Sequence, residues 1–257
     1  KKTIYVSLIN SNDMVDCINW NDMSSENQSF EFKQLPFSHP LYIMYSSGTT
    51  GKPKSIVHSS GGTLLQHLKE LIIHTDLKRE DKIFYFTTCG WMMWNWLVSS
   101  LAVGSTIVLY DGNPFYPYND SLLEIANSIG ISVFGTSAKY ISALEQNNLI
   151  PNNKFSFQKL RSILSTGSPL VEENFEYVYN KWKDTVQLCS ISGGTDIISC
   201  FALGNSIKPV KKGKLQSIGL GMSVKSFNQK GESKIDEKGE LVCTVPYPSM
   251  PIYFLND

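Results

Sequence analysis

The sequence lacks the usual marks of a secreted or membrane-spanning protein. No uninterrupted apolar run approaches the ~20 residues that span a bilayer, and the opening residues, KKTIYVSLINSND, lack the apolar core of a signal peptide. No Cys-x-x-Cys pair occurs among the five cysteines, which lie scattered among apolar neighbours: Cys17, Cys89, Cys189, Cys200 and Cys243. These absences predict a cytoplasmic protein whose thiols are free and structural.

An excess of either charge is also missing, since 23 Lys and Arg offset 23 Asp and Glu. Binding along a nucleic-acid backbone usually requires a basic excess, so we expect no nucleic-acid partner, and any anion site must be local. Internal repeats, heptads and low-complexity tracts are absent as well. What is present, 257 residues of which 42% are hydrophobic, describes an ordinary globular protein of roughly one or two domains.

Strand-like and helix-like patterns alternate between Leu41 and Ala202. A helix is predicted where apolar residues recur at helical spacing, at Leu64, Leu65, Leu68, Leu71 and Ile72. Short runs indicate strands, among them LYIMY, KIFYF, STIVLY, ISVFG, LRSIL and VQLCSI. The alternation predicts an α/β fold with a mainly parallel sheet flanked by helices.

Beyond Ala202 the helical patterns stop, and Gly-rich turns separate short strands. We therefore expect three regions, namely an irregular lead-in at residues 1–40, an α/β nucleotide- and acyl-binding core at residues 41–202, and a small β-rich subdomain at residues 203–257.

Unusual residues follow several predicted strands, where α/β sheets bind ligands. The segment YSSGTTGKPK, Tyr45–Lys54, combines hydroxyl side chains, glycines and lysines, so its amides and hydroxyls can surround an anion. It predicts an ATP phosphate cradle formed by Ser46, Ser47, Gly48, Thr49, Thr50, Gly51, Lys52 and Lys54. A plain Gly-Ser-Thr turn is the alternative. A Walker A loop is disfavoured, because Pro53 stands where that motif requires Ser or Thr.

This segment resembles the phosphate loop of the adenylate-forming superfamily, which includes acyl-CoA synthetases, luciferases and nonribosomal-peptide adenylation domains. Four further strings follow in family order. CGWMMWNW looks like the acyl-pocket segment, LSTGSPL is similar to the adenine-contacting turn, SISGGTDI stands at the Thr-Glu motif, and KGELVC resembles a later strand. Within the superfamily the strings are most similar to those of acetoacetyl-CoA synthetases.

The resemblance implies an acid-thiol ligase that works in two steps. Acetoacetate attacks the α-phosphorus of MgATP to give an acyl-adenylate and pyrophosphate, and coenzyme A then displaces AMP. Both steps require donors that hold negative charge. The implied catalytic residues are Thr195, Asp196 and Lys52, and Asp196 is the implied Mg²⁺ ligand where the family has glutamate. A helix-capping acid is the alternative for Asp196.

The resemblance also implies which residues surround the adenine. One side is expected to be formed by Gly167, Ser168 and Pro169, and the other by Ser190, Ile191 and Ser192. A glycine-led turn lets the base lie close to the backbone, whereas a purely structural turn is the alternative.

The implied acyl pocket consists of Trp91, Met92, Met93, Gly193 and Gly194. Gly193 stands where acetyl-CoA synthetases have a tryptophan that truncates the pocket, which implies an acid larger than acetate. The apolar wall suits a short chain, although a packed helix start is the alternative for its Met and Trp residues. Donors for a keto group are left open among Asn95, Ser137 and Ser192.

Family members are considerably longer than this chain. Their ribose-binding aspartate, hinge and lysine-bearing carboxy-terminal domain have no counterpart here, so we expect a fragment that is inactive alone. The alternatives are a non-catalytic nucleotide-binding core and a synthetase for another short-chain carboxylic acid.

Overall fold

The protein is described by a computed structural model that covers residues 2–6, 16–23, 31–46 and 53–255. It divides into two compact units, Lys1–Leu35 and Pro36–Asp257. In the first unit, strand β1 (Thr3–Tyr5) pairs in parallel with β2 (Cys17–Asn19), and the 3-10 turn η1 (Trp20–Asp22) follows. The lead-in that the sequence predicted to be irregular therefore contains a short parallel ribbon.

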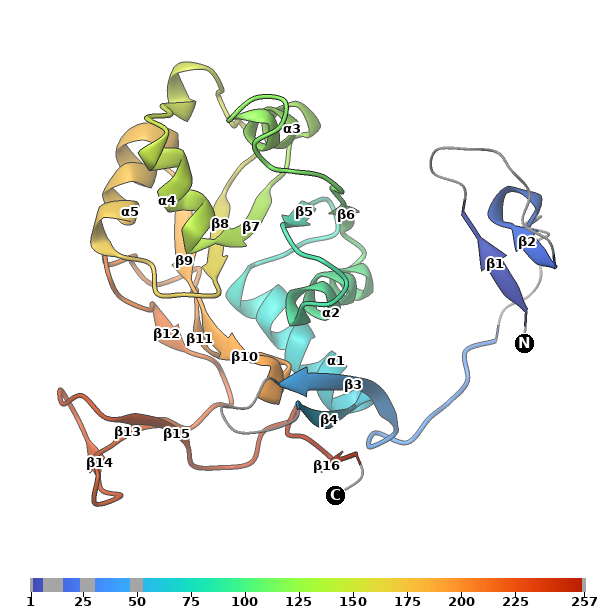
Figure 1. Ribbon diagram of the computed structural model, residues 1–257. Helices are drawn as coiled ribbons and strands as arrows, with labels where there is room; N and C mark the ends of the chain where they lie inside the picture. Colours follow the sequence, from blue (N-terminus) through green and yellow to red (C-terminus); the bar gives the residue numbers. More distant parts are fainter. Residues whose placement is uncertain (1, 7–15, 24–30, 47–52, 256–257) are drawn as a thin grey trace. The chain divides into compact units, whose positions relative to one another are not determined.

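The centre of the second unit is a five-stranded parallel sheet with the order β6-β5-β7-β8-β9 (Figure 1). Its strands are β5 (Lys82–Tyr85), β6 (Thr106–Val108), β7 (Val133–Ser137), β8 (Ser162–Thr166) and β9 (Gln187–Ser190). The sequence predicted all five. This sheet, with helices between its strands, confirms the predicted α/β class.

Helices connect these strands and cover both faces of the sheet. One layer contains α3 (Ser121–Ile129), α4 (Ala138–Gln146), and α5 (Glu172–Tyr177) with its π-helical extension η5 (Val178–Trp182). The other contains α1 (Ser60–Leu68) with its π-helical extension η2 (Lys69–His74), and α2 (Met92–Val98) with the 3-10 turn η3 (Ser99–Val103). A further 3-10 turn, η4, spans Pro151–Asn153.

Local capping explains several helix ends. The Ser59 hydroxyl accepts from the Gly62 amide (3.1 Å) at the start of α1, and Ser137 accepts from Tyr140 (3.2 Å) at the start of α4. Helix α3 ends at Ile129 and is followed by Gly130, whose φ of +73° is a left-handed conformation that favours glycine.

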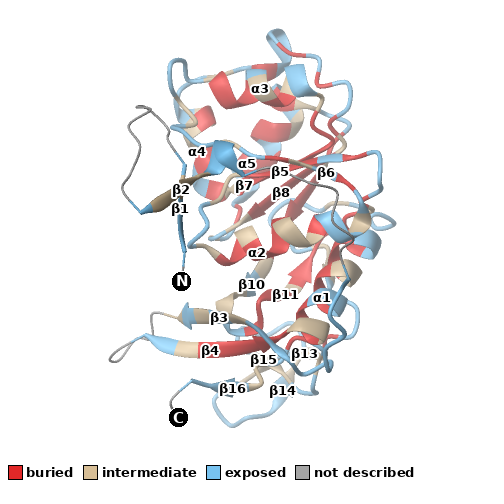
Figure 2. Cartoon of the chain, turned by 90° about the vertical axis from the view of Figure 1, so that its right-hand side faces the viewer, coloured by how far each residue is buried: buried red, intermediate tan, exposed pale blue. Residues whose placement is uncertain are grey.

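The core follows the two-residue period of the strands. Phe84, Phe134, Ile163 and Leu188 face the layer with α3, α4 and α5, whereas their neighbours Ile83, Tyr85, Val133, Leu164 and Cys189 face α2 and η2. Both faces of the sheet are thus buried, as Figure 2 shows.

Three smaller sheets complete the second unit, with the orders β16-β4-β3, β10-β11-β12 and β14-β13-β15. The LYIMY run becomes β3 (Pro40–Ser46), which pairs antiparallel with β4 (Lys54–Ser59). That strand therefore lies outside the parallel sheet to which the alternation of strand and helix patterns assigned it. The remaining strands are β10 (Ser192–Gly194), β11 (Ser199–Leu203), β12 (Ser217–Ile218), β13 (Val224–Phe227), β14 (Ser233–Lys234), β15 (Glu240–Cys243) and β16 (Tyr253–Phe254).

The 3-10 turn η6 (Thr195–Ile197) connects β10 to β11. Beyond Ala202 the described chain contains only the short strands and turns that the sequence predicted. The division at residues 202 and 203 stays a prediction. No helix in the described ranges has both the length and the apolar character that a bilayer crossing requires.

Candidate functional site

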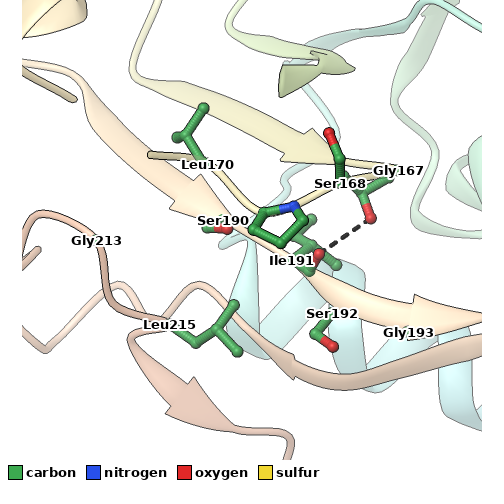
Figure 3. Close-up of a pocket in the computed structure, with 11 residues that line it drawn as sticks. Gly167, Ser168, Leu170, Ser190, Ile191, Ser192, Gly193, Gly213 and Leu215 are labelled. Carbon is green, nitrogen blue, oxygen red and sulfur yellow. Dashed lines mark hydrogen bonds between the residues drawn. The ribbon is translucent and has the colours of Figure 1, made fainter. Parts of the chain in front are cut away.

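A cavity of about 440 Å³ opens at the carboxyl ends of the adjacent parallel strands β8 and β9 (Figure 3). This is the edge at which α/β sheets bind ligands. The lining consists of Thr166, Gly167, Ser168, Pro169, Leu170, Ser190, Ile191, Ser192, Gly193, Gly213 and Leu215. All six residues predicted to surround the adenine are among them.

Two neighbouring turns, which follow β8 and β9, line this cavity and are bonded to each other. The Thr166 hydroxyl donates to the Ile191 carbonyl (3.0 Å), and the Ile191 amide donates to the Ser165 carbonyl (2.8 Å). Gly167 has a φ of +88°, in which a side chain would be strained, so the turn after β8 requires glycine. The spacing of the walls is therefore fixed by backbone geometry and hydrogen bonds.

A second, smaller cavity of about 80 Å³ adjoins the first. The two share Thr166, Gly167, Ile191 and Gly193. The rest of the smaller lining comes from the start of α2 and from the β10–β11 hairpin, namely Trp91, Met92, Met93, Gly194, Thr195, Ser199 and Cys200. All five residues predicted for the acyl pocket lie here.

Strand β11 closes one side of the smaller cavity at Gly193. A Cβ there would lie 2.1 Å from the Ser199 carbonyl oxygen and 2.7 Å from the Cys200 Cα, so the backbones approach too closely for any side chain. At Gly194 a Cβ would meet nothing within 4 Å. The role of Gly193 in admitting a longer acid stays a prediction, and the close approach of β11 is a second reason for glycine.

The turn with Thr195 and Asp196 connects β10 to β11, and Thr195 lines the small cavity. Ile198 follows it with a φ of +46°, a conformation that is costly for a β-branched residue. The Ser249 hydroxyl donates to the Ile197 carbonyl (2.7 Å), and Ile198 is completely buried. The surroundings thus hold the turn in a strained shape, with the Asp196 side chain exposed.

Three buried histidines bond to carbonyl oxygens of the segment that begins at this turn. His58 lies 3.1 Å from the Thr195 carbonyl through Nε2, and His67 lies 2.6 Å from the Ile198 carbonyl through the same atom. His74 donates from Nδ1 to the Gly204 carbonyl (2.8 Å) and accepts the Leu220 amide at Nε2 (3.0 Å). These bonds fix which ring nitrogen carries the proton.

Burial lowers the pKa of each of these histidines below its ordinary value. A nearby carboxylate and the bonded carbonyl raise the pKa by smaller amounts in each case, the carboxylate being Asp196 for His58 and Glu70 for His67 and His74. The neutral rings are thus structural supports of the turn.

Most of the predicted phosphate cradle lies outside the described residues, namely Ser47, Gly48, Thr49, Thr50, Gly51 and Lys52. Its two ends are described: Ser46 closes β3, and Lys54 opens β4 opposite it. Strand β3 lies beside η6, and His58 of β4 bonds to Thr195. The β3–β4 hairpin is therefore attached to the turn with Thr195 and Asp196.

A magnesium site built from protein groups alone is not found among the described residues, where no cluster of three His, Cys, Asp or Glu side chains occurs. Mg²⁺ is commonly held by one or two carboxylates together with substrate phosphates. A single exposed carboxylate at Asp196, beside the attached hairpin, fits that second arrangement.

Several lining residues had no predicted role. Leu170, Gly213 and Leu215 belong to the larger cavity, and Ser199 and Cys200 to the smaller. A plain Lys- and Gly-rich loop gives no signal for Gly213 or Leu215. Among the residues proposed as keto-group donors, Ser192 lines only the larger cavity, and Asn95 and Ser137 line neither.

Comparison with known proteins gives consistent matches. The model of the family described as AMP-binding enzyme matches residues 2–254. The chain is 57% identical over 226 residues to "Acetoacetyl-coenzyme A synthetase" of Rhizobium meliloti, covering 88% of this chain and 35% of that protein. It is 55% identical over 227 residues to "Acetoacetyl-CoA synthetase" of Gallus gallus, with coverages of 88% and 34%.

A solved structure agrees. "Acetoacetyl-CoA Synthetase from Streptomyces lividans" superposes with a TM-score of 0.94 at 42% identity, covering all of this chain and 40% of that one. The chain spans about a third of the length of the curated relatives that it matches. The family match extends over nearly the whole sequence, and the chain belongs to the AMP-binding enzyme family.

Proposed function

We propose that the full-length product of the gene encoding this chain ligates acetoacetate to coenzyme A. The reaction would consume ATP and release AMP and pyrophosphate through an acyl-adenylate. The relatives above carry the name of this activity, but the chain covers only about a third of their length. The proposal therefore concerns the whole protein, and the chain alone would be inactive.

The observation that carries the proposal is the pair of adjoining cavities that share Thr166, Gly167, Ile191 and Gly193. An acyl-adenylate has a base and an acyl group on either side of one phosphate, which is the shape of two connected compartments. The smaller has a volume of about 80 Å³, against about 440 Å³ for the larger. That volume suits a short acyl chain between Trp91 and Met93.

Each wall would then have a distinct task. The two bonded turns after β8 and β9 would hold the adenine, and Thr195 would donate to the phosphate of the adenylate. Ser46, Lys54 and the rest of the predicted cradle would bind the departing pyrophosphate. Bound Mg²⁺ would offset negative charge on the phosphates, with Asp196 as its protein ligand.

The substrate is tested by acetoacetate-dependent exchange of pyrophosphate into ATP, measured beside acetate, propionate and butyrate. We expect acetoacetate to give the highest kcat/KM, because the small cavity accepts more than an acetyl group. Acetate used equally well or better would overturn the proposed substrate. Asp196→Asn should reduce exchange at least about ten-fold, whereas Asp184→Asn, which changes another exposed aspartate, should not.

A non-catalytic nucleotide-binding core is the second candidate for this polypeptide by itself, because so much of its relatives' length lies outside it. Calorimetry of the chain with AMP would detect such a core. We also propose a cytoplasmic location, which rests on the five free cysteines, since reducing compartments keep thiols unpaired.

A further inference from the structure

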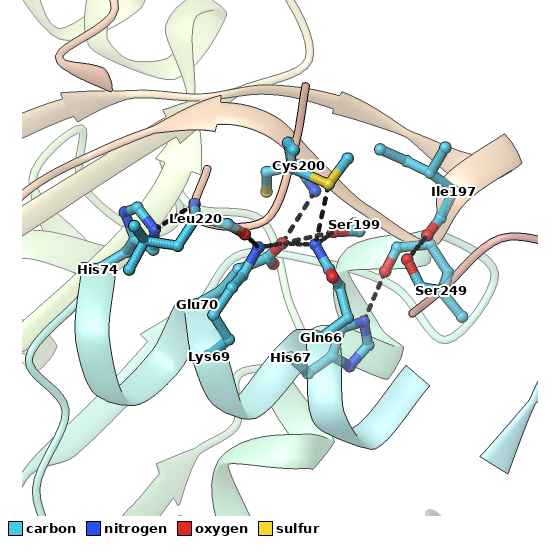
Figure 4. A network of polar contacts seen from close by, with 12 residues as sticks. Gln66, His67, Lys69, Glu70, His74, Ile197, Ser199, Cys200, Leu220 and Ser249 are labelled. Carbon is cyan, nitrogen blue, oxygen red and sulfur yellow. Dashed lines mark hydrogen bonds and ion pairs between the residues drawn. The ribbon is translucent and has the colours of Figure 1, made fainter. Parts of the chain in front are cut away.

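One buried carboxylate contacts two residues that line the small cavity, Ser199 and Cys200 (Figure 4). Glu70 of η2 is completely buried, and every polar group around it is a donor. Its Oε1 accepts from the Gln66 side chain (3.1 Å), from the Cys200 amide (3.2 Å) and from the Ser199 hydroxyl. Its Oε2 accepts from Trp96 Nε1 (2.9 Å).

These donors belong to the two walls of the cavity. Trp96 lies in α2 one turn after the lining residues Met92 and Met93, and Ser199 and Cys200 line the same cavity from β11. One carboxylate therefore bonds to both walls and sets the distance between them. Nearby, His67 makes a second bridge, from the Ser99 hydroxyl at the end of α2 to the Ile198 carbonyl just before β11.

The same network fixes the polarity of the cavity floor. The Ser199 hydroxyl donates to Glu70 and accepts from the Gln66 amide nitrogen (2.8 Å), so its proton is directed away from the cavity. The Thr166 hydroxyl is likewise used, by the Ile191 carbonyl. A bound acyl chain would therefore find the hydroxyl protons of Ser199 and Thr166 already donated to protein acceptors. Such a surface suits an uncharged chain.

Packing alone does not explain this arrangement. A buried carboxylate is costly to desolvate, and an apolar residue of similar size often stabilises a core as well or better. Lys69 offsets part of the charge, since its Nζ lies 3.7 Å from Glu70 Oε1 and donates to the Leu220 carbonyl (3.0 Å). Glu70 also lies in a π-helical stretch, a local irregularity often found at functional sites.

We propose that Glu70, supported by Gln66, is a positioning residue that determines acyl selectivity by fixing the two walls of the small cavity. The proposal rests on the proposed function, because it assigns that cavity to the acyl group. Glu70 touches neither cavity and acts only through Ser199, Cys200 and Trp96.

The test uses the full-length gene product and three variants. Glu70→Met removes every acceptor at similar volume, Glu70→Gln keeps one acceptor oxygen, and Trp96→Phe removes the bond to α2 together with part of the buried volume of the indole. Asp81→Asn is the matched control. It weakens another buried carboxylate network, with Arg161, at the amino end of β5 and away from both cavities. Pyrophosphate exchange gives KM for the acid and for ATP, and a thermal scan gives Tm.

We expect Glu70→Met to raise the KM for acetoacetate about ten-fold, equivalent to about 1.4 kcal/mol, while KM for ATP changes less than about two-fold. The preference for acetoacetate over butyrate should fall by a similar factor. Glu70→Gln should keep part of this preference. Trp96→Phe should lower the preference and raise the KM for acetoacetate by smaller factors. Asp81→Asn should lower Tm without changing selectivity.

A Glu70→Met variant that loses Tm as the control does, yet keeps its KM and selectivity for acetoacetate, would show that Glu70 is only structural. Should that variant fail to fold, Trp96→Phe decides, because unchanged selectivity there overturns the proposal. A wild-type enzyme that ignores acetoacetate refutes the proposed function instead. The same selectivity comparison is then made with the acid that it does activate.

Discussion

Alanine substitutions at Gly193 and at Gly194 should have opposite effects, although the residues are neighbours in one strand. A Cβ added at position 193 would lie 2.1 Å from the Ser199 carbonyl oxygen, about 1.3 Å short of ordinary contact. Strand β11 cannot move away easily, because Glu70 bonds to the Ser199 hydroxyl and the Cys200 amide. We expect Gly193→Ala to cost about 1–3 kcal/mol of unfolding free energy.

Gly194 has an extended backbone, with φ −178° and ψ 173°, and open space around its missing Cβ. Alanine there restricts the unfolded chain without strain, which stabilises by about 0.4–1 kcal/mol. The two variants should therefore differ by roughly 1.4–4 kcal/mol.

Urea unfolding of the 257-residue chain, followed by the fluorescence of its five tryptophans, measures this difference. The slope of the transition should be the same for both variants, so that the midpoints report stability. In the full-length enzyme, Gly193→Ala should also impair acetoacetate-dependent exchange. A Gly193→Ala variant within about 0.5 kcal/mol of Gly194→Ala would refute the close approach of β10 and β11, since that spread is usual for unconstrained surface positions.

The remaining two predictions concern stability. Burial lowers the pKa of His67 and His74 below 6.5, so the unfolded chain binds more protons in acid. The unfolding free energy should fall as pH drops below about 6.5, by at most ~1.4 kcal/mol per pH unit for each ring, and a flat profile between about pH 7 and 5 would contradict this. Arg161 donates to both Asp81 oxygens (3.3 and 2.6 Å) and to the Thr75 carbonyl (3.0 Å). Arg161→Lys should cost about 1–3 kcal/mol of unfolding free energy, because a single ammonium cannot make these bonds together. An unchanged midpoint of urea unfolding would show that these guanidinium bonds do not stabilise the fold.

Much of the parallel sheet was predictable, because its strands are short apolar runs separated by helical patterns. The assignment of LYIMY to that sheet was wrong for a physical reason. A strand pattern records burial on each face but not the partner, and β3 finds its partner in β4, the next described strand along the chain. The motif residues line the two cavities, because they sit after neighbouring strands whose ends converge, and the ligands of these cavities stay predictions.

Residues that reach a cavity from an unrelated part of the chain were not predictable. Leu215 meets the larger cavity only because the loop after β11 folds back over it, and no local pattern encodes that return. Ser199 and Cys200 carried a weak signal, since strand alternation after the TDI turn directs side chains to both faces. Their role depends on Glu70, which lies 129 residues from Ser199 in the sequence.

The helix of α1 and η2 shows most clearly how a correct pattern can indicate the wrong face. Its helical period was predicted from apolar residues, of which Leu71 is buried, yet Leu64, Leu65 and Ile72 are 43%, 53% and 48% exposed. The buried face carries a polar stripe instead, formed by Gln66, His67, Glu70 and His74.

That stripe bonds to the segment from Ile198 to Gly204 and so supports the turn with Thr195 and Asp196. Apolar packing tolerates small sliding of one element over another, whereas each of these bonds is satisfied in only one register. A helix that lines neither cavity can therefore hold the strand that forms the floor of one. Loss of the stripe should consequently change the geometry of the small cavity as well as the stability of the fold.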